Sequence, residues 1–91
     1  MFLKKLDQLI EDRKNNPKEG SYTSSLFEEG LDRILRKIGE EAGEVIIAAK
    51  NNDSEELKNE AADLIFHLMV ILRNQGLSLS DIDELLLNRN K

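Results

Sequence analysis

The chain has 91 residues and a formal net charge of −5, with 40% apolar and 34% charged residues. This length predicts a single domain over residues 1–91, and a composition with few aromatic residues is typical of a helical protein rather than a β-sandwich. The acidic balance argues against a general nucleic-acid binder, which would carry a basic face. The sequence has no cysteine, which excludes disulfides, zinc–thiolate sites and thiol nucleophiles. We expect a cytoplasmic protein with no membrane partner, since neither a signal-peptide core nor a membrane-spanning run is present.

Apolar residues at helical spacing predict a first helix over residues 2–15, which the sequence Asn15-Asn16-Pro17 ends. Ser25, followed by Glu28 three positions later, matches a capping box and predicts the start of a second helix. One apolar stripe runs along this helix and consists of Leu31, Ile34, Leu35, Ile38, Ala42, Val45, Ile46 and Ala49.

A third helix is expected over residues 54–74, after a turn at two asparagines. Asp53 caps its start, and Gly76 supplies a left-handed residue just beyond its end. Ser78 or Ser80 then begins a short fourth helix. The expected fold class is therefore all-α, with a helical hairpin core and short flanking helices.

The centre of the third helix, with the sequence LIFHLMVIL over residues 64–72, is apolar on every side except at His67. A helix that is hydrophobic all round must be buried all round, and a chain of this length has too few other helices to cover it. We therefore predict a homodimer with a four-helix-bundle-like core. The alternative is a monomer with an exposed apolar face, which is uncommon among soluble monomers.

Four carboxylates lie at matched distances from the expected turn at Asn52. Glu44 and Glu60 are each eight residues from it, and Glu41 and Asp63 are each eleven. An antiparallel hairpin therefore brings four negative charges into a small volume beside an apolar seam. Each acid could instead be an ordinary solvated residue on a charged face, but the two matched pairs weaken that alternative.

Such a cluster without a cation would raise carboxylate pKa values and push the helices apart. A bound divalent cation removes both penalties, so the spacing predicts a metal site. The only histidine, His67, does not stand in the Glu-x-x-His arrangement of di-iron bundles. Hard oxygen ligands favour Mg²⁺, or Mn²⁺, over zinc or iron. Because Mg²⁺ commonly completes its shell with substrate phosphates, the site points to phosphate-ester or phosphoanhydride chemistry.

Two motifs carry a resemblance to a known group of enzymes. Gly39-Glu40-Glu41-Ala42-Gly43-Glu44, followed by Glu60-Ala61-Ala62-Asp63, resembles the EExxE…ExxD signature of the all-α nucleotide pyrophosphatases, the MazG-like superfamily. Within it, the segments GSYT (20–23), KIGEE (37–41), NEAADL (59–64) and HL (67–68) resemble the phosphoribosyl-ATP pyrophosphatase family. The resemblance covers residues 20–89. Phe66 departs from it, because Tyr is common before the histidine, and we attach no function to this difference.

The resemblance implies hydrolysis of phosphoribosyl-ATP between its α and β phosphates, giving phosphoribosyl-AMP and pyrophosphate, the second step of histidine biosynthesis. It also implies a helical dimer and a stand-alone enzyme, because the chain is too short for the cyclohydrolase domain fused to many relatives. It implies, as Mg²⁺ ligands, Glu41, Glu44, Glu60 and Asp63. The alternatives are a house-cleaning nucleoside triphosphate pyrophosphatase of the same superfamily and, from a different class, a non-catalytic helical dimerisation module.

The catalytic candidates are Glu40, Glu41 and Glu44. Glu40 could act as a base or hold a second metal ion, or it could be a solvated helix acid. Lys37, one turn before Glu41, could reach a substrate phosphate or simply pair with Glu41.

The substrate-binding candidates are Ser21, Tyr22, Thr23, Lys37 and His67. The first three could bind phosphate or ribose hydroxyls from a loop, although the plainer alternative is a turn that leads into a capped helix. His67, one turn after Asp63, could contact the substrate or be a hydrogen-bonded core histidine. Lys50 and Arg73 are further possible neighbours of a substrate phosphate, with no specific motif behind them.

Overall fold

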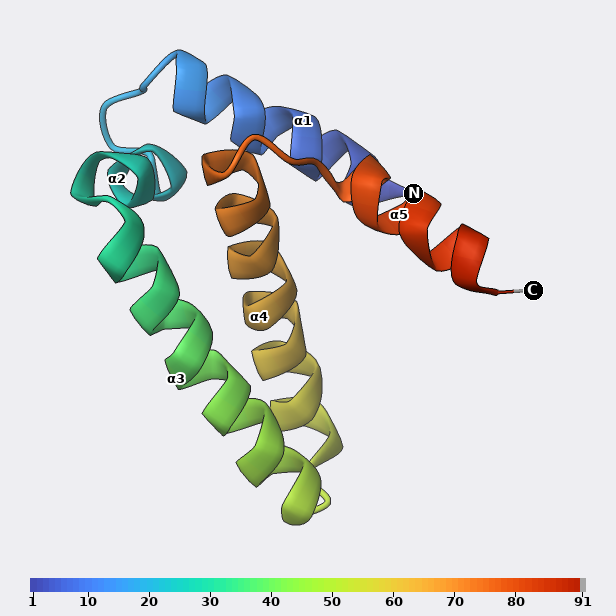
Figure 1. Cartoon of the computed structure of the whole chain (residues 1–91). Helices are drawn as coiled ribbons and strands as arrows, with labels where there is room; N and C mark the ends of the chain where they lie inside the picture. The colour runs from blue at the N-terminus through green and yellow to red at the C-terminus, as the bar shows by residue number, and fades with distance from the viewer. Residues whose placement is uncertain (91) are drawn as a thin grey trace.

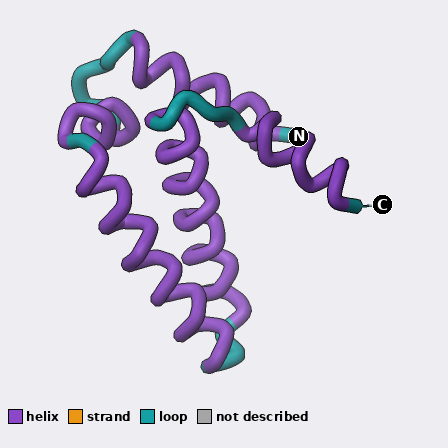
Figure 2. Tube along the Cα trace, viewed as in Figure 1, coloured by secondary structure: helices purple, strands orange, loops and turns teal. Residues whose placement is uncertain are grey.

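The structure, a computed structural model, describes residues 1–90. Its helices are α1 (Phe2–Asn15), α2 (Tyr22–Glu29), α3 (Leu31–Lys50), α4 (Ser54–Asn74) and α5 (Leu79–Arg89). Residues 1–90 contain no strand, so the all-α fold class is confirmed (Figure 2). Within the same range, none of the helices has the length and apolar character needed to cross a membrane.

The long helices α3 and α4 form the expected antiparallel hairpin and pack on each other more extensively than any other pair (Figure 1). At the end of the hairpin away from its turn, α1 packs on α4, and α2 packs on both α1 and α3. Helix α5 lies beside the start of α1 and extends away from the hairpin. The hairpin is therefore closed at one end by α1 and α2 and extends freely at its turn.

After the first loop the chain forms two helices where the sequence predicts a single one. Ser21 caps α2, because its side chain accepts a hydrogen bond of 3.1 Å from the backbone N–H of Ser24. Gly30 then separates α2 from α3 with a φ of 97°, a conformation that only glycine adopts readily. Ser25 lies inside α2, and its hydroxyl donates to the carbonyl of Tyr22. The predicted helix start at Ser25 is therefore wrong, since the start lies four residues earlier and Gly30 interrupts the helix.

The other predicted helix boundaries are confirmed. Asp53 accepts a hydrogen bond of 3.1 Å from the backbone N–H of Glu56 at the start of α4. Gly76, with a φ of 79°, follows the end of that helix. Asp81 accepts a hydrogen bond of 2.8 Å from the backbone N–H of Ser78. This capping box shows which of the two candidate serines begins α5.

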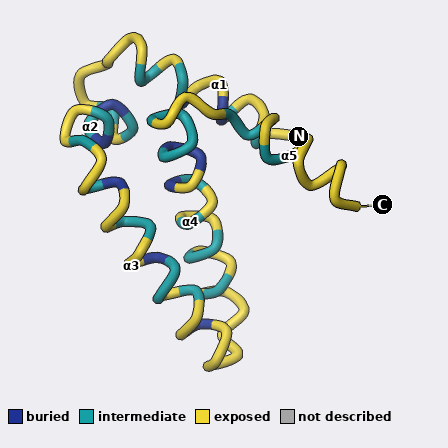
Figure 3. The backbone as a smooth tube through the Cα atoms, viewed as in Figure 1, coloured by how far each residue is buried: buried dark blue, intermediate teal, exposed yellow. Residues whose placement is uncertain are grey.

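The hydrophobic core lies where α1 and α2 close the end of the hairpin. Its buried members are Ile10, Leu26, Ile34, Met69 and Val70. Full burial of each such side chain contributes roughly 1.5–3 kcal/mol to folding. Burial declines toward the turn of the hairpin (Figure 3), where Ile46 is 63% exposed. On α4, Ile65 and Leu68 also remain 43% and 41% exposed, so the chain by itself does not bury the apolar centre of this helix on every side.

A partly buried charged group, which we call the Arg73 cluster, ties α1 to the end of α4 and consists of Asp7, Glu11 and Arg73. Arg73 donates to the two carboxylate oxygens of Asp7 at 3.1 and 2.8 Å and to Glu11 at 3.1 Å. Asp7 is 5% exposed, and its hydrogen bonds raise the pKa of Arg73 above the ordinary value. In the described residues Arg73 thus binds Asp7 and Glu11 and holds α1 to the end of α4.

Candidate active site

The facing sides of α3 and α4 carry the acid cluster, which consists of Glu41, Glu44, Glu60 and Asp63. Partial burial raises the pKa of Glu60 above its ordinary value of 4.5, and a hydrogen bond with Glu56 raises it further. The charges of Glu56, Glu44 and Asp63 act in the same direction. Like charges shift a carboxyl pKa only over short distances. The hairpin therefore brings Glu44 of α3 near Glu60 of α4, as their equal spacing from the turn predicts, whereas Asp63 is a neighbour of Glu60 on the same helix.

Glu41 is the buried member of the acid cluster, with 9% of the residue exposed. Its Oε1 lies 2.6 Å from Nδ1 of His67. The hydrogen on that nitrogen, however, is directed along a 2.8 Å hydrogen bond to the backbone carbonyl of Asp63. Among the described residues, Glu41 Oε1 thus has no aligned donor. A buried carboxylate oxygen without a partner is unfavourable, so this position favours a cation.

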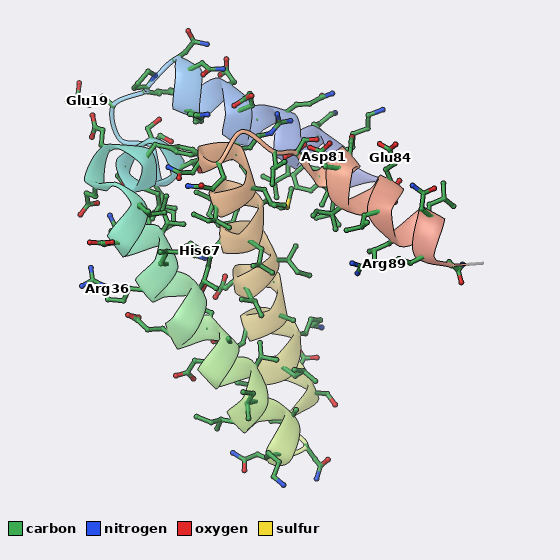
Figure 4. All side chains as sticks on the ribbon, viewed as in Figure 1. Glu19, Arg36, His67, Asp81, Glu84 and Arg89 are labelled. Carbon is green, nitrogen blue, oxygen red and sulfur yellow. The ribbon has the colours of Figure 1, made fainter. Side chains whose placement is uncertain are left out.

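His67 lies between α3 and α4 (Figure 4), and its side chain is only 5% exposed. Its Nε2 is 3.0 Å from the hydroxyl oxygen of Tyr22, at the start of α2. The imidazole also packs edge-on against Phe66, with the ring centroids 5.1 Å apart. His67 therefore joins three helices, because it contacts Glu41 on α3 and Tyr22 on α2 from its own place on α4.

The structure separates the three candidate residues around the start of α2. Ser21 is the N-cap of the helix. Tyr22 is 45% exposed and, with Lys18, lines an open hollow of about 630 Å³. Thr23 instead lines a neighbouring hollow of about 350 Å³ on the side of Arg13. Only Tyr22 reaches the acid cluster, and it does so through His67.

The candidates on α3 outside the acid cluster lie nearer to solvent. Glu40 is exposed, and Lys37 is partly buried. Within residues 1–90, Lys37 does not form the alternative ion pair with Glu41, whose basic neighbour there is His67. Both side chains are therefore free to act on a bound substrate.

Sequence reasoning did not find Arg33. Its guanidinium lies 5.5 Å from the ring centroid of Tyr22, a cation–π distance, and it pairs with Glu29. Arg33 is one helical turn before Lys37 and two before Glu41, so the i, i+4 spacing along α3 is a signal that could have identified it. It adds a positive charge beside the hollow at Tyr22.

Ser24 was also missed. It is 4% exposed, donates to the carbonyl of Arg13 at 3.0 Å and accepts from the backbone N–H of Lys18 at 3.1 Å. These bonds attach the loop before α2 to the end of α1. Nothing in the sequence distinguishes this serine from Ser25, because its role depends on how α1 and α2 pack.

The donors of the acid cluster suit a hard divalent cation, since all four are carboxylates. Among residues 1–90, no three His, Asp or Glu side chains lie close enough together to hold a metal ion. The fit to Mg²⁺ therefore lies in three other features. These are the oxygen donors, the buried oxygen of Glu41 that has no aligned donor and the raised pKa of Glu60.

Comparison with known proteins gives a consistent result. A sequence profile of the family described as phosphoribosyl-ATP pyrophosphohydrolase matches residues 3–90. The phosphoribosyl-ATP pyrophosphatase of Clostridium acetobutylicum is 54% identical over 90 residues, which cover 99% of this chain and 82% of that protein. The enzyme of the same name from Limosilactobacillus fermentum is 58% identical over 82 residues, 90% of this chain and 77% of that protein. The histidine biosynthesis bifunctional protein HisIE of Bacillus subtilis is 54% identical over 89 residues, 98% of this chain and 43% of that protein.

Proposed function

The chain belongs to the phosphoribosyl-ATP pyrophosphohydrolase family, and we propose that it hydrolyses phosphoribosyl-ATP between the α and β phosphates. The products are phosphoribosyl-AMP and pyrophosphate, and the reaction is the second step of histidine biosynthesis. The observation that carries the proposal is the buried Oε1 of Glu41, which has no aligned donor among the described residues, together with the charges of Glu44 and Asp63 that act on Glu60. A non-catalytic dimerisation module would leave this arrangement unexplained.

We assign the binding of Mg²⁺, or of Mn²⁺, to Glu41, Glu44, Glu60 and Asp63. When bound, the ion supplies positive charge that neutralises phosphate oxygens and lowers the pKa of a water molecule. The assignment is supported by the all-oxygen donor set and by the raised pKa of Glu60. Partial burial and the hydrogen bond with Glu56 raise this pKa most, the charges of Glu44 and Asp63 add to the shift, and a bound cation would favour the ionised form.

Residues around the acid cluster have separate roles in this proposal. Glu40, exposed on α3, accepts a proton from the attacking water. Lys37 binds a phosphate oxygen, and Arg33 is placed to add a second positive charge near Tyr22. Ser21 accepts the capping hydrogen bond and still has its own hydroxyl hydrogen to donate to a phosphate or ribose oxygen.

We also propose that the enzyme is a cytoplasmic homodimer. Ile65 and Leu68 stay exposed on α4, where they form part of an apolar hollow of about 310 Å³ shared with α5. A second copy packed on this face would complete the burial that the apolar centre of α4 requires. Light scattering after size exclusion should give twice the chain mass of 10.4 kDa, and the mass of a single chain would contradict the dimer.

The substrate assignment is tested by measuring pyrophosphate release from phosphoribosyl-ATP and from a panel of ordinary nucleoside triphosphates, with Mg²⁺ and with EDTA. We expect release that needs the metal and is fastest with phosphoribosyl-ATP. Faster hydrolysis of the ordinary nucleotides would instead identify a house-cleaning pyrophosphatase. Absence of any hydrolysis, together with a melting temperature that Mg²⁺ does not raise, would favour the dimerisation module.

A further inference from the structure

His67 is the most enclosed polar side chain of the candidate active site, and both of its ring nitrogens contact protein atoms. Nε2 lies 3.0 Å from the Tyr22 hydroxyl. Nδ1 lies 2.8 Å from the carbonyl of Asp63 and 2.6 Å from Oε1 of Glu41. We propose that His67 is a positioning residue that couples Tyr22 to Glu41, instead of contacting the substrate itself. This inference rests on the proposed function, since it assigns Glu41 to the metal site.

The chemistry of the neighbours fixes the direction of the hydrogen bonds. The backbone carbonyl of Asp63 can only accept, so Nδ1 carries a hydrogen. In the neutral imidazole, Nε2 then has a free lone pair and accepts the hydroxyl hydrogen of Tyr22. Tyr22 therefore donates to His67, and His67 donates toward Asp63 and Glu41.

The Nδ1 hydrogen faces two acceptors at similar distances. It is aligned with the carbonyl of Asp63, while Glu41 Oε1 lies 2.6 Å from the same nitrogen without alignment. When Glu41 binds a different partner, the attraction of its carboxylate for the Nδ1 hydrogen changes. The enclosed imidazole then alters the hydrogen bond that its Nε2 accepts from Tyr22. Outer hydrogen-bond partners commonly orient metal-binding side chains in this way.

Tyr22 is placed to pass the effect to the substrate side of the site. It is the first residue of α2, and its ring lines the hollow of about 630 Å³ while its hydroxyl points inward to His67. Phe66 stacks against the same ring, with the centroids 6.3 Å apart. The hydroxyl is thus the connection between the loop before α2 and the acid cluster.

A first experiment uses the metal-free protein. Tyr22 is the only tyrosine and the chain has no tryptophan, so ultraviolet-excited emission reports on this residue. Glu41→Gln should change the emission intensity of Tyr22, because it alters the acceptor beside His67. Glu40→Gln, one position away and exposed, is the matched control and should leave the emission at the wild-type level. Equal emission from the wild type and the Glu41→Gln variant would overturn the coupling.

A second experiment measures Mn²⁺ affinity by electron paramagnetic resonance. Tyr22→Phe removes only the hydroxyl and should weaken Mn²⁺ binding roughly threefold to tenfold, the lower part of the range for outer-shell partners. The matched control is Ser25→Ala, which removes a hydroxyl from the same helix whose hydrogen bond ends on the backbone of α2. It should bind Mn²⁺ as the wild type does. Unchanged Mn²⁺ affinity in Tyr22→Phe would contradict the proposal.

A double-mutant cycle separates coupling from two independent effects. In His67→Asn the shorter amide retains a donor near the position of Nδ1 but does not reach Tyr22. If the coupling runs through His67, adding Tyr22→Phe to this variant should cause no further loss of Mn²⁺ affinity. Additive losses would overturn the proposal. A wild-type protein that binds no Mn²⁺ would contradict the proposed function instead, and the emission of the metal-free variants would still decide the coupling.

Discussion

The Arg73 cluster and the acid cluster both bring carboxylates together with residues of α4. Only the Arg73 cluster contains a permanently charged cation, the guanidinium of Arg73. Arg73 donates to both oxygens of Asp7 and to one of Glu11, and those bonds raise its pKa. In the acid cluster the charged form of a side chain is disfavoured instead. The neighbouring acids help to raise the pKa of Glu60, and a buried oxygen of Glu41 has no aligned donor.

The difference separates the scaffold of the molecule from its site. A domain of this size has only a few kcal/mol of net stability, so repulsion that serves no purpose would be costly. Within residues 1–90, Arg73 neutralises the acids where α1 meets α4, but no Lys or Arg pairs with the acids between α3 and α4. The missing positive charge is therefore expected to come from outside the chain. Changes in the Arg73 cluster should alter stability, whereas changes in the acid cluster should alter the chemistry.

The largest effect is expected from removing a charge of the acid cluster. Asp63→Asn and Glu44→Gln should each lower kcat/KM for phosphoribosyl-ATP by at least roughly 100-fold, because each removes a metal-binding oxygen. Both residues are exposed, so the folded structure should be retained. Circular dichroism and steady-state pyrophosphate release measure the two effects.

The matched control for these variants is Glu55→Gln. Glu55 lies on α4, the helix of Asp63, but it is exposed and does not belong to the acid cluster. Its carboxylate pairs with the amine of Lys58, at a distance of 3.2 Å. Its replacement should leave turnover at the wild-type level. Full activity in either acid-cluster variant would contradict the ligand assignment.

The next effect is on stability. Arg73→Met leaves the buried carboxylate of Asp7 without its partner and should lower the free energy of unfolding by about 3 kcal/mol. Urea denaturation measures the change. Lys58→Met, which breaks an ion pair between two exposed side chains, should change it by less than about 1 kcal/mol. Similar losses in the two variants would show that the Arg73 cluster is no more than a surface ion pair.

The hairpin and the closeness of Glu44 to Glu60 could be predicted from the sequence because both follow from local rules. Asp53 caps α4 within the turn, and the helical period then fixes which acids face each other. The charge of Glu44 that acts on Glu60 follows from that register. No information on distant packing was needed.

The contacts of His67 could not be predicted in the same way. Tyr22 is 45 positions away along the chain, and its hydroxyl reaches the imidazole only because α2 is a separate helix. That separation depends on Gly30, which the apolar stripe of the expected longer helix concealed. Where the helix boundary was wrong, the neighbours of the histidine were necessarily missed.

A smaller effect, opposite in sign to that of Arg73→Met, is expected beside the acid cluster. Gly43→Ala should raise the free energy of unfolding by about 0.5–1 kcal/mol, because alanine favours the helix and the added methyl group meets no atom within 4 Å. Thermal or urea denaturation measures it. Gly30→Ala is the control and should destabilise, since the φ of 97° strains any other residue. A loss of stability in Gly43→Ala would mean that a second copy packs against this position.

The smallest effect concerns pH and the metal-free protein. The pKa of Glu60 is higher in the folded chain than its ordinary value of 4.5, so folding favours the protonated form, and ionisation of Glu60 above that pH disfavours folding. Glu60→Gln should therefore be more stable than the wild type at pH 7 in EDTA, with the difference vanishing as the pH falls below about 4.5. Added Mg²⁺ should reverse the order, because the cation stabilises the wild type more. Glu55→Gln, which removes an equal charge outside the acid cluster, should show no such reversal. A reversal in this variant would show that the effect comes from net charge alone.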